Sequence, residues 1–181
     1  MTAQLVNATA TAGRDFGAVH LDATSRIFVP ESRDVTGIVS LEAWFRFDAA
    51  PPDGERTGIL DTEDRPEMSL FHHRIDGLHV VRCAIGDQEV YAPYTACPAR
   101  GRTSRACART AACASTATAP SSTDAPNSCS SGAIGRGGMA IGQHNHGGVD
   151  DWLVGAIDTL RLWDVPLSPS DVCASAGRTD C

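Results

Sequence analysis

The sequence contains no lysine. All 15 basic residues are arginine, against 22 acidic residues, and the net charge at pH 7 is −7. No basic run occurs in the chain. Nucleic-acid binding needs a basic face, so this composition argues against a nucleic-acid partner. The exclusive use of arginine also indicates a GC-rich coding sequence.

Long apolar runs are absent as well. No stretch approaches the roughly 20 apolar residues that a membrane helix needs, so we expect no membrane insertion. Residues 1–15 lack the charged region and apolar run of a secretory signal. We therefore expect either a cytoplasmic chain or a fragment of a longer secreted protein.

A third absence is local. Between Thr95 and Ala133 there is no Val, Ile, Leu, Met, Phe, Tyr or Trp. Such a segment cannot bury enough apolar surface to offset chain entropy, which predicts disorder and no central strands. One interpretation is a low-complexity insertion. We prefer a shifted reading frame, because residues 97–124, back-translated with mostly GC-rich codons and read two nucleotides on, allow the strand-like text PGAWTHVACVREDGRLRVYRDGTVVD. The coding DNA tests this hypothesis.

On both sides of this segment the pattern is that of β-strands. Residues 39–47 alternate apolar and polar side chains, as a strand with one buried face does. Asp76-Gly77 predicts a hairpin turn between strands at 68–75 and 78–85. Further short strands are expected at 18–22, 26–30, 57–61, 89–91, 139–142 and 152–163. The sequence thus predicts an all-β sandwich.

One short helix is expected near the C-terminus, over residues 169–176. Ser168 is its N-cap, Pro169 its first residue and Asp171 the acid of a capping box, with Gly177 ending it. No internal repeat is visible, so the chain is interpreted as one domain.

Several motifs then suggest a family. Residues 39–45 are VSLEAWF, and the closing part of the chain carries IGQ at 141–143, GAID at 155–158, LRLW at 160–163 and PLSPSDV at 166–172. Together these motifs resemble the laminin-G-like and pentraxin-like domains of the concanavalin A-like lectin/glucanase superfamily. The closing run is the more specific part of the match.

The resemblance implies an antiparallel jelly-roll of two sheets over 16–176, interrupted at 95–133. Residues 1–15 are then an N-terminal extension and 177–181 a C-terminal tail. The resemblance also implies a non-catalytic extracellular recognition or adhesion module. Such a module binds carbohydrate or protein ligands and belongs to a larger multi-domain protein. Members of this family often bind calcium at the rim of a sheet.

Pentraxins carry acidic and amide calcium ligands in the loop after IGQ. Calcium prefers several oxygen ligands, and histidines in that loop suit it poorly. The loop is therefore a candidate ligand-binding loop that consists of Gln143, His144, Asn145 and His146.

Three acidic residues are candidate calcium ligands. Asp64 matches one acid of an earlier pentraxin loop, where its neighbour does not match. Asp150 and Asp151 form an alternative rim site, although a solvated turn accounts for the pair more simply.

Two tryptophans are candidate surfaces for stacking on a sugar ring. Trp44 lies on the strand face opposite Phe45, and packing under a loop or against the other sheet is the alternative that we favour. Trp152, beside the acidic pair, is the more exposed candidate.

No catalytic motif is present. The Glu-x-Asp-x-x-Glu run of sandwich glycosidases, the Gly-x-Ser-x-Gly elbow and phosphate-binding glycine loops are all missing. We therefore expect a protein that is not an enzyme. The alternatives are a carbohydrate-active enzyme of the same superfamily, or a frameshift-damaged module with no activity.

Cysteine placement suggests an oxidising compartment. Cys173 and Cys181 flank a short C-terminal loop and could pair with each other. Cys83 lies on an expected strand, and the shifted text would supply a cross-strand partner. Two disulfides would fit an extracellular location.

Overall fold

The structure is a computed structural model that describes residues 2–13, 17–32, 35–38, 40–62, 68–86, 88–94, 109–114, 133–134, 137–144 and 151–175. Its strands are β1 (Gln4–Val6), β2 (Thr9–Ala12), β3 (Gly17–Leu21), β4 (Arg26–Val29), β5 (Ser40–Phe47), β6 (Arg56–Thr62), β7 (Met68–Ile75), β8 (Leu78–Ile85), β9 (Gln88–Tyr94), β10 (Arg109–Ala114), β11 (Met139–Ile141) and β12 (Gly155–Trp163). A short helix, α1, spans Pro169–Ser175.

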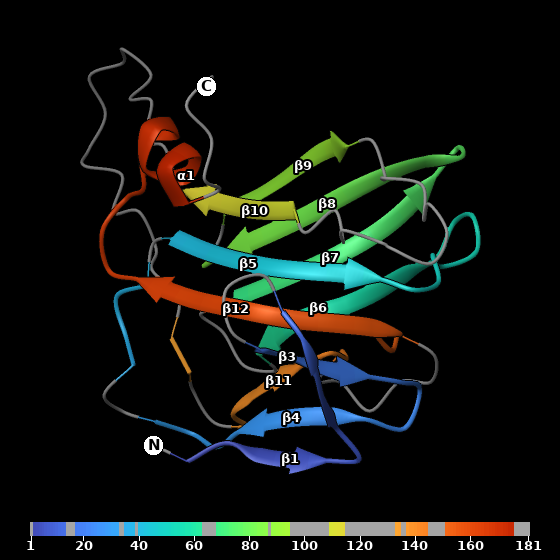
Figure 1. The fold of residues 1–181 in the computed structure, drawn as a ribbon. Coiled ribbons are helices and arrows are strands. Elements are labelled where there is room, and N and C mark those ends of the chain that lie inside the picture. Colours follow the sequence, from blue (N-terminus) through green and yellow to red (C-terminus); the bar gives the residue numbers. More distant parts are fainter. Residues whose placement is uncertain are drawn as a thin grey trace, which may run out of the picture.

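The strands form two antiparallel sheets. The seven-stranded sheet has the order β1-β4-β11-β6-β7-β8-β9, and the five-stranded sheet has the order β10-β5-β12-β3-β2. Figure 1 shows the sheets as two layers, with β5 and β12 in front of β6, β7 and β8. The prediction of an all-β fold with two antiparallel sheets is confirmed.

The core lies between the two layers. It is formed by inward-facing residues of β3 to β8, β11 and β12, as the alternation along β5 predicts. Fully buried members include Leu21, Leu41, Ile59, Leu60, Met68, Leu70 and Leu153. Each such side chain contributes about 1.5–3 kcal/mol by leaving water, so the core holds the sheets together.

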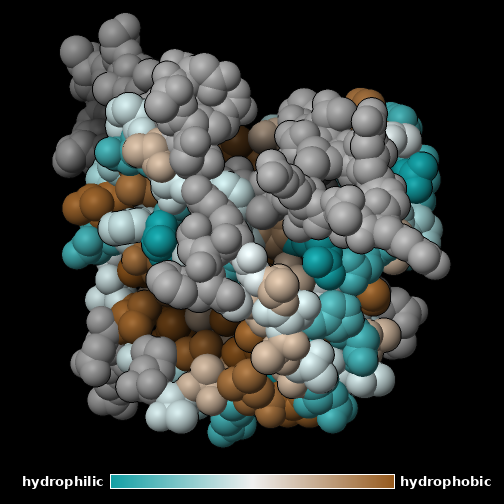
Figure 2. Space-filling view, viewed as in Figure 1, coloured by the Kyte–Doolittle hydropathy of each residue, from teal (hydrophilic) through white to brown (hydrophobic). Residues whose placement is uncertain are grey.

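Two edge strands lie where the sequence places an N-terminal extension. β1 pairs with β4, and β2 pairs with β3, so the sheets begin at Gln4 rather than at residue 16. Leu5 and Val6 are 58% and 39% exposed on β1. Figure 1 draws β1 at the bottom of the molecule, and Figure 2 shows apolar residues in the lower part of the same view. Alternation could not reveal β1, because none of its residues is buried.

A third edge strand, β10, lies inside the 95–133 segment, where no strand is expected. It pairs antiparallel with β5 from Arg109 to Ala114. The expectation is wrong for these residues, because strand pairing uses main-chain N–H and C=O groups that small residues supply as well as large ones. Apart from β10 and Ala133, the segment lies outside the described residues.

The helix α1 is capped and tied to the five-stranded sheet. The Asp171 N–H donates to Ser168 Oγ at 3.2 Å, and the Ser168 N–H donates to Asp171 Oδ2 at 2.9 Å, which is a capping box. Glu42 on β5 is 1% exposed and accepts hydrogen bonds from Arg161 of β12 and from the hydroxyl of Ser175. These contacts fix α1 on the outer face of that sheet.

His72 of β7 is a histidine that faces the core. His72 on β7 is fully buried, and its ring centroid lies 4.1 Å from that of Phe47. Its Nε2 atom lies 2.9 Å from Nδ1 of His79. Burial, with a further contribution from His79, lowers the pKa of His72 to about 3. The imidazole is therefore neutral at pH 7.

Candidate functional site

The outer face of the seven-stranded sheet carries a row of polar and aromatic side chains. Pairing places Phe71 of β7 opposite Arg82 of β8, and Arg82 opposite Tyr91 of β9. In the adjacent row Arg56 of β6 is opposite His73. Leu70 and Cys83, which alternate with these residues, point into the core. Side chains from four strands therefore share one surface.

Phe71 lies at the centre of this surface and is only 1% exposed. The guanidinium of Arg56 lies 4.7 Å from the centroid of its ring, and that of Arg82 lies 5.7 Å away. The rings of His73 and His144 meet it edge-on. We call the group the Phe71 cluster, and its members are Arg56, Asp61, Phe71, His73, Arg82, Glu89, Tyr91, His144 and Asp151.

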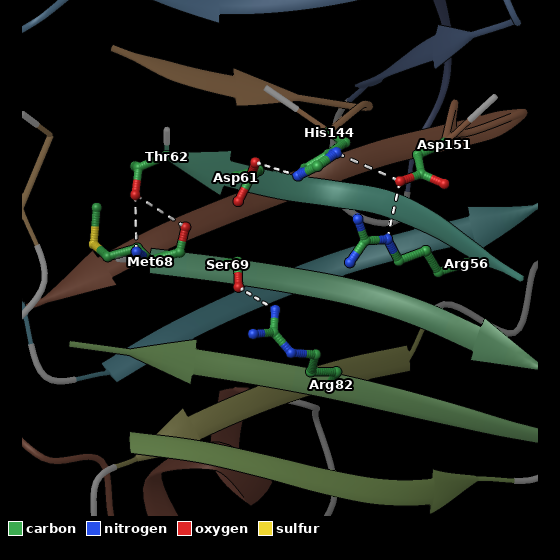
Figure 3. Close-up of polar contacts among 8 residues, drawn as sticks. All are labelled: Arg56, Asp61, Thr62, Met68, Ser69, Arg82, His144 and Asp151. Carbon is green, nitrogen blue, oxygen red and sulfur yellow. Dashed lines mark hydrogen bonds and ion pairs between the residues drawn. The ribbon is translucent and has the colours of Figure 1, made fainter. Parts of the chain in front are cut away.

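An ion-pair chain runs along one side of the cluster, as Figure 3 shows. Arg56 Nε donates to Asp151 Oδ2 at 2.9 Å. The two ring nitrogens of His144 lie 3.5 Å from Asp151 Oδ2 and 3.5 Å from Asp61 Oδ2. His144 thus stands between two carboxylates, of which that of Asp61 is only 5% exposed.

A second polar group lies on the other side of Phe71. Arg82 pairs with Glu89 through Nε. It also donates from Nη1 to Ser69 Oγ at 2.8 Å (Figure 3). The hydrogen bond from Arg82 is the main cause of a lowered pKa at Glu89, and the hydrogen bond from Tyr91 lowers that pKa further. The hydrogen bond to Glu89 raises the pKa of Tyr91. Near pH 7 this side presents a carboxylate, a guanidinium and a neutral phenol.

His73 lies between the two arginines. Burial lowers its pKa, and the guanidinium groups of Arg56 and Arg82 lower it further. Its Nε2 atom is buried and has no hydrogen-bond partner among the described residues. Its ring contacts that of Tyr91 at a centroid distance of 6.0 Å. His73 is therefore neutral at pH 7 and adds no charge to the surface.

Gly58 allows the loop that carries His144 to reach the sheet. It lies opposite Phe71 in the β6–β7 pairing, and its N–H donates to the carbonyl oxygen of Asp151 at 2.8 Å. A Cβ atom at Gly58 would lie 2.4 Å from the carbonyl carbon of Gln143 and 2.6 Å from the amide nitrogen of His144. The missing side chain is therefore what places His144 and Asp151 over the cluster.

Replacing Gly58 with alanine should destabilise the chain by about 1–3 kcal/mol, because the new methyl group collides with main-chain atoms that cannot rotate away. Urea denaturation measures this change. Gly17→Ala on β3 is a matched control that should change stability by less than about 0.5 kcal/mol, since its nearest atom is 3.7 Å away. Equal midpoints for the two variants would show that the loop does not pack on Gly58.

The structure brings two of the residues proposed from the sequence together, namely His144 and Asp151. Gln143 lies beside them but is 9% exposed, and Trp152 is half-buried. Trp44 is distant from the cluster, on the outer face of the five-stranded sheet. Its ring is 7% exposed, so a sugar could stack on it only if what covers it moved.

The other candidates lie outside the described residues: Asp64, Asn145, His146, Asp150 and Cys181. Cys173 is in α1, and its pairing with Cys181 stays a prediction. Cys83 is disulfide-bonded. Among the described residues no three His, Cys, Asp or Glu side chains are placed to hold a metal ion, and calcium binding also stays a prediction.

Sequence reasoning missed Arg56, Phe71, Arg82, Glu89 and Tyr91. One signal was present: residues 69, 71 and 73, which share one face of β7, are serine, phenylalanine and histidine. The alternation along these residues predicts a strand, but it does not show which residues of other strands will lie beside this face.

Comparison with known proteins adds no relative. No protein-family model, curated protein or solved structure matches this chain. Within the described part of the chain, no helix has the length and apolar character needed to cross a bilayer. Because no relative is found, the function is inferred from the Phe71 cluster and its surroundings.

Proposed function

We propose that this chain is a non-catalytic recognition module, with the Phe71 cluster as its ligand-binding surface. The observation that carries the proposal is the placement of two guanidinium groups over Phe71, each paired with a carboxylate that is partly exposed. Paired charges that rest on an aromatic ring are held in fixed positions, so they can bind a ligand with little loss of side-chain entropy.

The motif resemblance supports the same conclusion. In this proposal the two sheets form a concanavalin A-like jelly-roll of the laminin-G or pentraxin type, working outside the cell within a larger protein. Its ligand is a glycan or an extracellular protein, and a calcium ion at the sheet rim assists binding in some members of that family.

A glycosidase is the second candidate, and the carboxylates of the cluster argue against it. A glycosidase needs two carboxyl groups that both reach the scissile bond. Here Asp61 and Asp151 are both engaged by the same imidazole, that of His144. The Asp61 carboxylate is almost fully buried, so a substrate could not reach it without a rearrangement.

The test combines binding with turnover. We expect the chain to retain a ligand on a glycan array or in a pull-down from extracellular protein, and to release no product from a panel of glycosidase substrates. Turnover that Asp151→Asn abolishes would overturn the proposal in favour of an enzyme.

A chain that binds nothing and unfolds without a cooperative transition would favour the damaged-module alternative. A cooperative melt would contradict that alternative, because a sandwich with lost strands exposes sheet edges and aggregates.

A further inference from the structure

The Phe71 cluster contains the same arrangement twice. Arg56 pairs with Asp151 on one side of Phe71, and Arg82 pairs with Glu89 on the other. Arg56 lies on β6 and Arg82 on β8, two strand spacings away, so the two pairs repeat at about 10 Å across the sheet. A repeated arrangement of this kind fits a ligand that is itself a repeating chain.

The Arg56–Asp151 pair presents donors beside acceptor oxygens, and Glu89 of the other pair adds further acceptor oxygens. Arg56 gives its Nε–H to Asp151, and among the described residues its Nη1 and Nη2 atoms make no hydrogen bond. The side chain of Arg56 is 37% exposed, and those of Asp151 and Glu89 are 21% and 42% exposed. A hydroxyl group both donates and accepts, so a guanidinium next to a carboxylate can bind two neighbouring hydroxyls of one ring.

Tyr91 extends this surface at the last strand of the sheet. It is 53% exposed, and its hydroxyl is hydrogen-bonded to Glu89. Its ring presents an apolar face next to polar groups, which suits the C–H face of a sugar ring. The surface thus offers hydrogen bonds at both ends and one aromatic contact.

The charges of the cluster favour a neutral ligand. The carboxylates of Asp61, Asp151 and Glu89 outnumber the two guanidinium groups, and a protonated His144 would only bring the sum to zero. An anionic polymer is therefore not attracted. A cationic one would have to approach the two guanidinium groups that lie over Phe71.

We infer that this face binds a neutral oligosaccharide of at least two sugar units, laid across β6 to β9 from the Arg56–Asp151 pair to Tyr91. The inference rests on the proposed function, that of a recognition module, and names the ligand class and its contacts. Arg56 supplies free donors, Asp151 and Glu89 supply acceptors, and Tyr91 stacks on one sugar ring.

Affinity electrophoresis through gels that contain single polysaccharides tests it. The neutral probes are mixed-linkage β-glucan, galactomannan and arabinoxylan, and the acidic probes are polygalacturonate and heparin. We expect retardation by at least one neutral polymer. Arg56→Gln should weaken that binding about tenfold or more, since a hydrogen bond to a charged group is worth about 1.5–3 kcal/mol. Tyr91→Ala should also weaken it, because the variant loses the aromatic face on which a sugar ring stacks.

Two control variants should bind like the original chain. Arg26→Gln removes an exposed arginine from β4, away from the cluster, and Val90→Ala changes a 52% exposed residue on the opposite face of β9 from Tyr91. Circular dichroism and the urea midpoint of each variant show whether it is folded, so that a loss of binding can be assigned to the surface.

The other outcomes separate this inference from the proposed function. Neutral binding that neither Arg56→Gln nor Tyr91→Ala changes would overturn the site and leave the recognition module standing. Retardation by the acidic polymers alone would overturn the neutral ligand class. If no polysaccharide binds but an extracellular protein does, the inference is wrong and the broader proposal survives. If nothing binds, both fail.

Discussion

Replacing Phe71 with alanine should lower the free energy of unfolding by about 3–5 kcal/mol, the cost of removing a fully buried phenylalanine. The ring is 1% exposed although it lies on the outer face of its sheet, because the guanidinium groups of Arg56 and Arg82 cover it. Without the ring, both groups lose the surface that holds them above the sheet. Urea denaturation, followed by circular dichroism, measures the change.

Ligand binding should fall with stability in this variant, which makes a second substitution necessary. Phe71→Leu keeps an apolar group beneath the arginines but removes the ring quadrupole, so it should recover most of the stability and less of the binding. Val90→Ala, at an exposed position on β9, is the control and should cost under about 1 kcal/mol. If Phe71→Ala were as stable as Val90→Ala, Phe71 would not be the centre of a packed cluster.

The second large effect concerns acid. Stability should fall as the pH drops from about 6.5 toward 3, because the folded chain keeps His72 neutral while the unfolded chain protonates it. The pKa of His72 is lowered from 6.5 to about 3 in the folded state. In this interval the unfolded state binds more protons, so acidification favours unfolding by up to about 1.4 kcal/mol per pH unit.

Urea midpoints measured at pH 7, 6, 5 and 4 test this dependence. Above pH 6.5 His72 is neutral in both the folded and the unfolded chain, so it should cause no change of stability with pH there. His72→Gln removes the titrating group and should reduce the slope between pH 6 and 4, although it also removes the hydrogen bond to His79. An unchanged slope in His72→Gln would assign the acid sensitivity to other groups.

Most of the strands could be predicted from the sequence because each is a local pattern. The alternation along residues 39–47 corresponds to β5, and Asp76-Gly77 forms the turn between β7 and β8, with both residues at positive φ. In a strand with one buried face, apolar residues recur at every second position, so the sequence itself shows where the strand lies. β1 and β10 show no such alternation, because β1 buries no side chain and β10 consists of small residues after Arg109.

The candidate site could be predicted only in part. The motif resemblance drew attention to the loop that follows β11, and His144 and Asp151 of that region do lie over the cluster. Asp61 and Arg56, their partners, are about 80 to 95 residues earlier in the chain. Nothing in the sequence near either group indicates the other, because the contact depends on how strands far apart in the chain pair.

The sequence by itself determined the secondary structure class, and it led us to expect neither a nucleic-acid partner nor catalysis. The absence of lysine, of long apolar runs and of catalytic motifs is a property of composition and spacing, and it needs no coordinates. Tertiary structure alone decided which residues form the surface. Strand register set Phe71 between Arg82 and Gly58, and the absence of a side chain at Gly58 let the loop with His144 close over it. Register and close approach are long-range properties, so the sequence alone could not show which residues gather at the candidate site.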